Sequence, residues 1–259
     1  MTTTSETTSD TDNKTDVIVK KKQNLRVVIY YAKKDDNFPK AGKYRLRRLQ
    51  EAFPEHKGNQ TRLFGVNKKA DFMTTWAEIK TLSEQYLLKR IHLFGHGDQH
   101  HIYLNGRGEH LALSDIRSLP TLEWAPDGVM ILHTCQSGRD HNETIKQEDG
   151  REIKNPTCLA KELSKSQSIR AIGNRIKANF SLSKAERELP YDYPSDYYFF
   201  VNDVYLWGYK SGSKVEEIHG NDDEYPLVED NKIWACRQFN KGKELARDLK
   251  NIETDLYFI

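Results

Sequence analysis

Two stretches of this chain, Arg90–Asp98 (RIHLFGHGD) and Gly128–Gly138 (GVMILHTCQSG), share one pattern. Each begins with a short, continuously apolar run and ends abruptly in small and polar residues. This pattern is typical of a strand that is buried on both faces, as in a parallel sheet, and that stops at an exposed edge. Because open α/β sheets bind ligands beyond the carboxyl ends of their strands, we expect a site where these two stretches end.

The residues at the two strand ends indicate thiol chemistry. His96 stands before Gly97 in the first stretch, and Cys135 stands shortly before Ser137 in the second. A cysteine nucleophile needs rigid backbone behind it and a neighbouring base that takes its proton or stabilises the thiolate. We therefore predict that Cys135 is a nucleophile and His96 its base. The amides of Gly97 and Cys135 are the predicted donors to a developing oxyanion.

Each of these residues also has a purely structural interpretation. A cysteine at a strand end is often just a small buried hydrophobe, and Gly-His-Gly is also the pattern of a tight turn with a solvated histidine. The other two cysteines serve as internal comparisons. Cys158 is expected inside a helix, next to Leu159, and Cys236 in an apolar strand, so both are expected to be structural.

A metal site is the rival chemistry for this region, because histidine is abundant there. The histidines weighed as ligands are His92, His96, His100, His101, His110 and His133. No spacing matches a C-x-x-C or H-E-x-x-H pattern, and one of the six lies in the apolar part of a strand. We therefore predict that the protein holds no metal, and the thiol chemistry proposed for Cys135 needs no cofactor.

The rest of the chain alternates strand and helix patterns, which favours a parallel sheet with right-handed crossovers. The predicted strands are Leu25–Ala32, Thr61–Val66, His101–Leu104 and Ile169–Asn174, and the predicted helices are Lys43–Phe53, Ala70–Tyr86, Leu113–Leu119 and one starting at Asn155-Pro156. After residue 180 the pattern changes. Tyrosine-rich segments there predict a hairpin, a strand over Ile233–Phe239 and a final helix over Gly242–Asn251.

These patterns divide the chain into three parts. Residues 1–23 are expected to be a disordered polar tail, because the first 16 lack the apolar surface that would offset the entropy of ordering. Residues 24–180 form the expected catalytic core. Residues 181–259 are expected to pack on that core as a sheet edge or a small subdomain, partly antiparallel and rich in aromatic residues.

The composition limits the classes of partner and compartment. With 40 Lys and Arg against 38 Asp and Glu, the net charge of +2 gives no attraction towards nucleic acid or anionic membrane. No apolar run reaches the roughly 18 residues of a membrane-spanning helix. The three cysteines fit a reducing compartment, and no secretory signal is visible. We expect a cytoplasmic protein, while export without a cleavable signal stays open.

Together, an apolar strand ending in Gly-His-Gly and an apolar strand ending in Thr-Cys-Gln-Ser-Gly resemble the caspase-like superfamily of cysteine peptidases, also called clan CD. The likeness is greatest to the CHAT and separase-like branch, with metacaspases further off. It covers roughly residues 24–179 by element order, but only about twenty residues by motif. The resemblance implies a three-layer α-β-α sandwich with a mostly parallel central sheet.

The resemblance also implies an activity and roles for single residues. It implies a cysteine endopeptidase in which His96 is the general base, Cys135 the nucleophile, and the amides of Gly97 and Cys135 the oxyanion hole. Its substrates would be proteins or peptides, cleaved after one dominant P1 residue. An activating partner is compatible with this implication, and so is cleavage within residues 139–154.

Two departures concern specificity and processing. Metacaspases carry an aspartate two positions before the cysteine, where this chain has His133, so a basic P1 preference is in doubt. The candidate substrate-binding residues are Asp98, His133 and Asp140, of which the two aspartates are the candidate sources of negative charge. In the segment after the cysteine, an ordinary solvated loop competes with a processing loop. The basic residues of that segment are Arg139, Lys146, Arg151 and Lys154.

Two other classes of function stay open at this point. One is a catalytically silent member of the same fold that serves as a binding or scaffold module. The other is a flavodoxin-like domain that binds a nucleotide or a metal. The sequence argues against a nucleotide site, because Ala32–Asp36 follows the first strand where a Gly-rich phosphate loop would stand.

Overall fold

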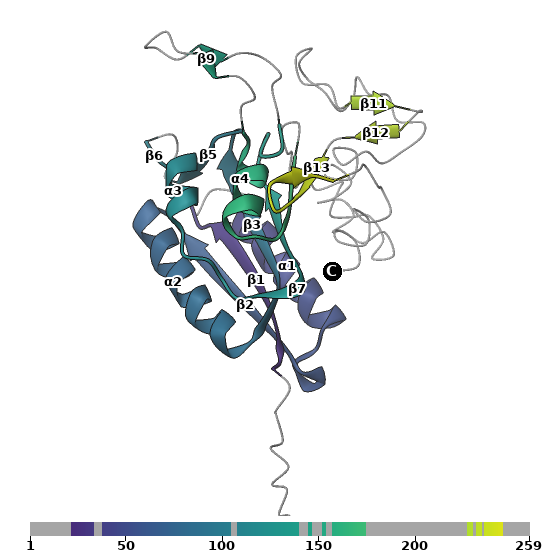
Figure 1. Cartoon of the computed structure of the whole chain (residues 1–259). Coiled ribbons are helices and arrows are strands. Elements are labelled where there is room, and N and C mark those ends of the chain that lie inside the picture. The colour runs from purple at the N-terminus through teal and green to yellow at the C-terminus, as the bar shows by residue number, and fades with distance from the viewer. Residues whose placement is uncertain are drawn as a thin grey trace, which may run out of the picture.

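A mostly parallel sheet organises the protein (Figure 1). The computed structural model describes residues 22–33, 38–104, 108–139, 145–146, 152–153, 157–174, 227–229, 232–234 and 236–245. Within these residues, seven strands pair in the order β14-β13-β10-β7-β3-β1-β2. Their bounds are β1 Asn24–Tyr31, β2 Asn59–Val66, β3 Leu87–Phe94, β7 Trp124–His133, β10 Arg170–Asn174, β13 Cys236–Asn240 and β14 Lys243–Glu244.

The direction of the strands changes at one edge of the sheet. Strands β2, β1, β3, β7 and β10 are parallel to their neighbours, whereas β13 runs antiparallel to β10, and β14 antiparallel to β13. The prediction of a mixed α/β fold with a mostly parallel central sheet is confirmed. The antiparallel edge comes from the C-terminal part of the chain, whose sequence pattern had changed after residue 180.

Helices cover both faces of the sheet. They are α1 Phe38–Ala52, α2 Lys69–Gln85, α3 Leu113–Ser118 and α4 Leu159–Ser166, with a 3₁₀ turn, η1, at Glu55–Lys57. The chain crosses from β1 to β2 in one direction along the sheet and from β2 to β3 in the other. Right-handed crossovers therefore put α1 and α2 on opposite faces. Gly42 of α1 lies against Tyr30, and Ala160 of α4 lies against Gly173.

The core follows from the apolar pattern of the strands. Leu25, Val27, Val28 and Ile29 of β1 are fully buried, as expected for a strand covered on both faces. Helix α2 adds the aromatic residues of its amphipathic face. Its Trp76 is buried, and its indole N–H donates to a backbone oxygen in the segment before β7 at 2.9 Å. The sheet is thus a rigid base for the residues that follow the ends of its strands.

Within the described residues, three smaller antiparallel sheets accompany the seven-stranded sheet. Strands β4 His96–Gly97, β5 His101–Leu104 and β6 Glu109–Ala112 form a three-stranded antiparallel sheet that continues directly from the end of β3. Strands β8 Ile145–Lys146 and β9 Glu152–Ile153 pair inside the charged segment after Cys135, where we expected an irregular loop. Strands β11 Leu227–Glu229 and β12 Lys232–Trp234 form another hairpin.

Several element boundaries differ from the sequence-based prediction. Helix α1 begins at Phe38 instead of Lys43, because Pro39 is tolerated in a first helical turn. Helix α4 begins at Leu159, after a non-helical Thr157-Cys158, so Cys158 precedes the helix instead of lying inside it. The predicted strand Ile233–Phe239 is divided between β12 and β13.

The predicted helix at Gly242–Asn251 is wrong where it begins. Lys241 and Gly242 have φ of 51° and 78°, and this left-handed pair turns β13 back into β14. Two successive residues with positive φ are the pattern of a tight hairpin turn. Pairing along the sheet edge therefore overrides the local helical pattern. Residues 246–251 lie outside the described part of the chain.

Candidate active site

The two predicted strand ends are neighbours at the centre of the sheet. Strands β3 and β7 pair in parallel, with Phe94 opposite His133. His96 and Cys135 each lie two residues beyond that pair. Both residues therefore follow the carboxyl ends of their strands at the same level. Gly97 holds the two ends close, because a Cβ added to it would lie 3.1 Å from the Cβ of Thr134. The same Cβ would lie 2.8 Å from the His101 carbonyl oxygen, so a larger residue would have to displace a neighbour.

His96 is an exposed residue with a restrained ring. The ring lies edge-on to Phe38, with centroids 4.8 Å apart and planes at 90°, and 6.0 Å from the ring of Tyr31. Both aromatic residues are themselves buried. The backbone is held as well, because His96 pairs with Tyr103 across β4 and β5. The imidazole therefore keeps a defined direction while remaining open to solvent.

Cys135 lies in a tight turn that follows β7. Its side chain is half-buried, which is the exposure expected of a reactive thiol. The next residue, Gln136, has a φ of 53°, a left-handed conformation that is uncommon outside glycine. The turn closes with a hydrogen bond from the amide of Arg139 to the Gln136 carbonyl oxygen at 2.8 Å. Such strain persists only where the surrounding structure determines it, and it is frequent at functional sites.

The surrounding structure here is the end of β10. Asn174 and Ser137, both fully buried, are joined by a hydrogen bond from the Asn174 amide to the Ser137 hydroxyl at 3.2 Å. The Gly138 amide donates to the Asn174 carbonyl oxygen at 2.7 Å. Neither polar residue was predicted to belong to the site. The available signal was that β10, like β3 and β7, is an apolar run ending in a polar residue.

Asp98, a candidate substrate-binding residue, organises the turn after β4. Its carboxylate accepts hydrogen bonds from the amides of His100 and His101 at 2.7 Å each, and from the Tyr103 hydroxyl. Burial alone would raise the pKa of Asp98, but these bonds and the His101 side chain outweigh it and lower the pKa. The carboxylate is therefore ionised at neutral pH and its oxygens are already engaged within the turn.

His133, another candidate for substrate binding, is enclosed in the core. Its ring is fully buried and stacks on Phe94 with centroids 4.1 Å apart. It shares a hydrogen bond with His92, Nε2 to Nδ1, at 3.0 Å. A ring without exposed surface cannot contact a P1 side chain, so the structure gives no support to that role. A histidine is tolerated at this buried position because the pairing of β3 with β7 brings His92 beside it as a hydrogen-bond partner.

The remaining candidates lie in or beside the segment after the turn. Arg139 is half-buried and follows the Cys135 turn directly. Lys146 lies in β8. Asp140, Arg151 and Lys154 lie outside the described residues, so their roles in substrate binding and processing stay predictions.

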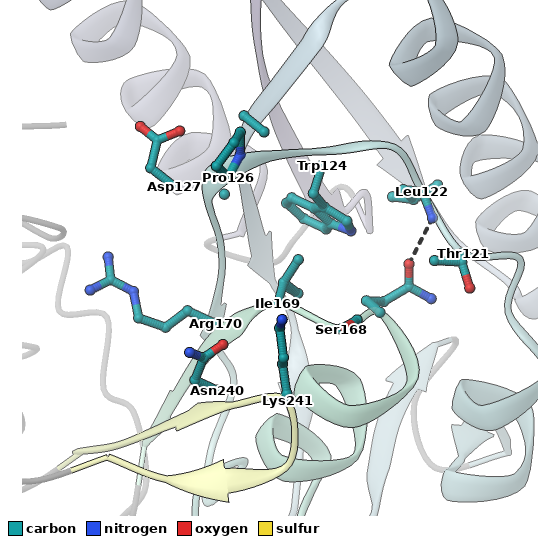
Figure 2. A pocket seen from close by; sticks show the side chains of 13 residues that line it. Thr121, Leu122, Trp124, Pro126, Asp127, Ser168, Ile169, Arg170, Asn240 and Lys241 are labelled. Atoms are coloured by element: carbon teal, nitrogen blue, oxygen red, sulfur yellow. Dashed lines mark hydrogen bonds between the residues drawn. The ribbon is translucent and has the colours of Figure 1, made fainter.

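A cavity of about 660 Å³ lies at the amino ends of strands β7 and β10 (Figure 2). Trp124 and Arg170, the first residues of β7 and β10, line it together with Lys241 at the tip of the β13–β14 turn. His96 and Cys135 follow the other ends of their strands, so this cavity is separate from the candidate site.

In the described part of the chain, no helix is long and apolar enough to cross a membrane. No group of three or more His, Cys, Asp and Glu residues within those same ranges is arranged to hold a metal ion.

Comparison with known proteins gives similarity at the level of structure. No family model matches the chain, and no curated protein matches it significantly in sequence. A secreted C11 cysteine protease from Bacteroides thetaiotaomicron, solved in complex with an irreversible peptide inhibitor, has 10% identity and a TM-score of 0.43. The alignment covers 85% of this chain and 66% of that protease.

Two caspase structures give similar values. Caspase-1 from Spodoptera frugiperda has 11% identity and a TM-score of 0.41, with 87% of this chain and 92% of that chain covered. The structure named pro-sf-caspase-1 has 8% identity and a TM-score of 0.38, covering 85% and 88%. Likenesses this distant carry no conclusion about activity, so we base the functional assignment on the geometry of the strand ends.

Proposed function

We propose that this protein is a cysteine endopeptidase that uses Cys135 as nucleophile and His96 as general base. The observation that carries the proposal is the register of the two central strands. Because Phe94 pairs with His133, the thiol and the imidazole leave adjacent parallel strands at the same level. A half-buried thiol on a tight turn and an exposed, aromatic-braced imidazole fit the two roles.

The proposed reaction proceeds in two steps. The Cys135 thiolate attacks the scissile carbonyl carbon, and the carbonyl oxygen becomes an oxyanion that receives hydrogen bonds from the amides of Gly97 and Cys135. His96, having taken the thiol proton, donates it to the leaving amine as the peptide bond breaks. Water then attacks the acyl-enzyme, with His96 accepting its proton, and releases the new carboxyl end and the thiol.

The substrate in this proposal is a protein or peptide with one dominant P1 residue. Asp140 is the remaining candidate for a negative charge near the thiol, since Asp98 is engaged in its turn. Assignment to the CHAT and separase-like branch rests on the two sequence motifs alone. Cleavage within residues 139–154, and an activating partner, remain parts of the proposal that need their own tests.

Mapping of cleavage sites tests the proposal directly. The purified protein and its Cys135→Ala variant are incubated with a complex peptide library under reducing conditions at neutral pH, and new termini are identified by mass spectrometry. We expect termini that follow one residue type and that arise only with the unaltered protein. Cys158→Ala is the matched control, because Cys158 is a buried cysteine outside the site, and it should cleave normally.

Labelling of the thiols separates the proposal from a catalytically silent module. An electrophile of low intrinsic reactivity should modify Cys135 in preference to the other two cysteines, and His96→Ala should slow that reaction. Equal cleavage by the Cys135→Ala variant would refute the peptidase. So would an unreactive Cys135 in a protein that cleaves no peptide of the library.

A further inference from the structure

The peptide group that joins Thr134 to Cys135 is anchored at its carbonyl end. The Thr134 carbonyl oxygen accepts a hydrogen bond from the Asn174 side-chain amide at 3.1 Å and another from the Ser137 hydroxyl at 3.1 Å. Both donors are fully buried. A backbone oxygen that receives two buried side-chain donors is held in direction more firmly than a strand end usually is.

The geometry of a peptide group transmits this anchoring to the Cys135 amide. The described peptide bonds are trans, so the C=O and the N–H of one peptide plane point in opposite directions. Asn174 belongs to β10, which lies on one side of β7, while β3 lies on the other. With its oxygen directed to β10, the peptide therefore directs the Cys135 N–H towards the β3 side, where His96 and Gly97 emerge.

We propose that Asn174 and Ser137 are positioning residues that orient the Cys135 amide as an oxyanion donor. This inference rests on the proposed peptidase function and deepens it. Neither residue touches the substrate. They act through one peptide plane, and they also polarise it, because donation to a carbonyl oxygen makes the amide proton of the same group a better donor.

The packing around the two residues supports a positioning role. A Cβ added to Gly138 would lie 2.3 Å from the Gly173 carbonyl oxygen, so the two backbones are in contact and the turn cannot shift along β10. Within the described residues, the side-chain oxygen of Asn174 has no hydrogen-bond partner. A buried polar group that is only half satisfied is a poor choice for stability alone, which favours a functional reason for its presence.

Two substitutions test the inference in complementary ways. Asn174→Leu keeps a similar side-chain size but cannot donate, and Ser137→Ala removes only one hydroxyl, so it is the variant with the smaller effect on folding. For each, kcat and KM are measured on the best-cleaved peptide of the library. We expect kcat to fall about tenfold to a hundredfold, less than for loss of a direct oxyanion donor, with KM nearly unchanged.

A pair of thiol probes separates positioning from general damage. Alkylation of Cys135 by iodoacetamide is a displacement at a saturated carbon and forms no oxyanion, so its rate should be unchanged in both variants. A peptide aldehyde of the preferred sequence adds to the thiol and forms a tetrahedral oxyanion. Its affinity should fall in parallel with kcat.

The outcomes separate the inference from the function on which it rests. If the unaltered protein cleaves peptides and both variants retain its kcat, the inference is refuted and the peptidase stands. If alkylation and cleavage fall together, with a lower melting temperature, the two residues are merely structural and the inference is again refuted. An unaltered protein that cleaves nothing and whose Cys135 is unreactive refutes the peptidase, and the inference with it.

Discussion

The buried histidine pair beneath the candidate site predicts a protein that loses stability in mild acid. His92 and His133 are fully buried and share one hydrogen bond, which requires at most one proton on the facing nitrogens. Burial lowers the pKa of both rings well below the ordinary value of 6.5, and the nearby guanidinium of Arg45 lowers it further. For His92, the charges of Arg90 and Arg26 act in the same direction.

The sign and size of the effect follow from proton linkage. In the unfolded chain both histidines bind a proton near pH 6.5, whereas in the folded protein they stay neutral. Below pH 6.5 the unfolded state therefore binds more protons, and the free energy of unfolding falls as the pH falls, until the folded-state pKa values are reached. Between pH 7.5 and 5.5 the two rings together should contribute a loss of about 3 kcal/mol.

Urea unfolding at pH 7.5 and 5.5 measures this loss. Carboxylates with lowered pKa values, such as Asp98, lose their contribution only at lower pH, so they add little in this window. The variant His133→Phe, which preserves the stack on Phe94, should have about half the pH dependence. His110→Gln is the control, because that ring is exposed. A free energy of unfolding that stays constant over this range, or an unchanged dependence in His133→Phe, would contradict the assignment of two neutral buried rings.

Two further predictions concern residues that pack beside Cys135 and His96. Gly138→Ala should force the turn away from Gly173, which lowers the free energy of unfolding by about 1–3 kcal/mol and abolishes cleavage. Urea unfolding and peptide cleavage assays measure the two effects. Normal values in both assays would exclude a close backbone contact. Phe38→Leu removes the ring that packs against His96, so we expect the free energy of unfolding to fall by about 0.5–1.5 kcal/mol and kcat to fall several-fold. Unaltered kinetics would mean that this ring contact is dispensable.

The sequence predicted the strand ends well because their signal is local. The runs before His96 and Cys135 are apolar throughout and stop at glycine or small polar residues, which marks both a buried strand and its end. The alternation of helix and strand patterns then suffices for a parallel sheet. The neighbouring positions of β3 and β7 were an assumption at that stage, and the observed pairing confirms it.

What the sequence did not predict depends on contacts between distant residues. His133 stands where metacaspases carry an aspartate, and the structure buries it beside His92, its hydrogen-bond partner on another strand. Asn174 carried no motif, and only the pairing of β10 with β7 brings it to the Cys135 turn. At Gly242 a locally helical pattern lost to hydrogen bonding along a sheet edge. In each case contacts between distant residues decide what a local pattern does not show.

The order of the strands also has a consequence for synthesis on the ribosome. Strands β3 and β7 are translated before β10, although β10 supplies the Asn174 donor that fixes the Cys135 peptide. A nascent chain therefore contains His96 and Cys135 before it contains Asn174, the residue proposed to orient the Cys135 amide. If Asn174 has that role, the geometry of the candidate site is completed only after both proposed catalytic residues have been synthesised.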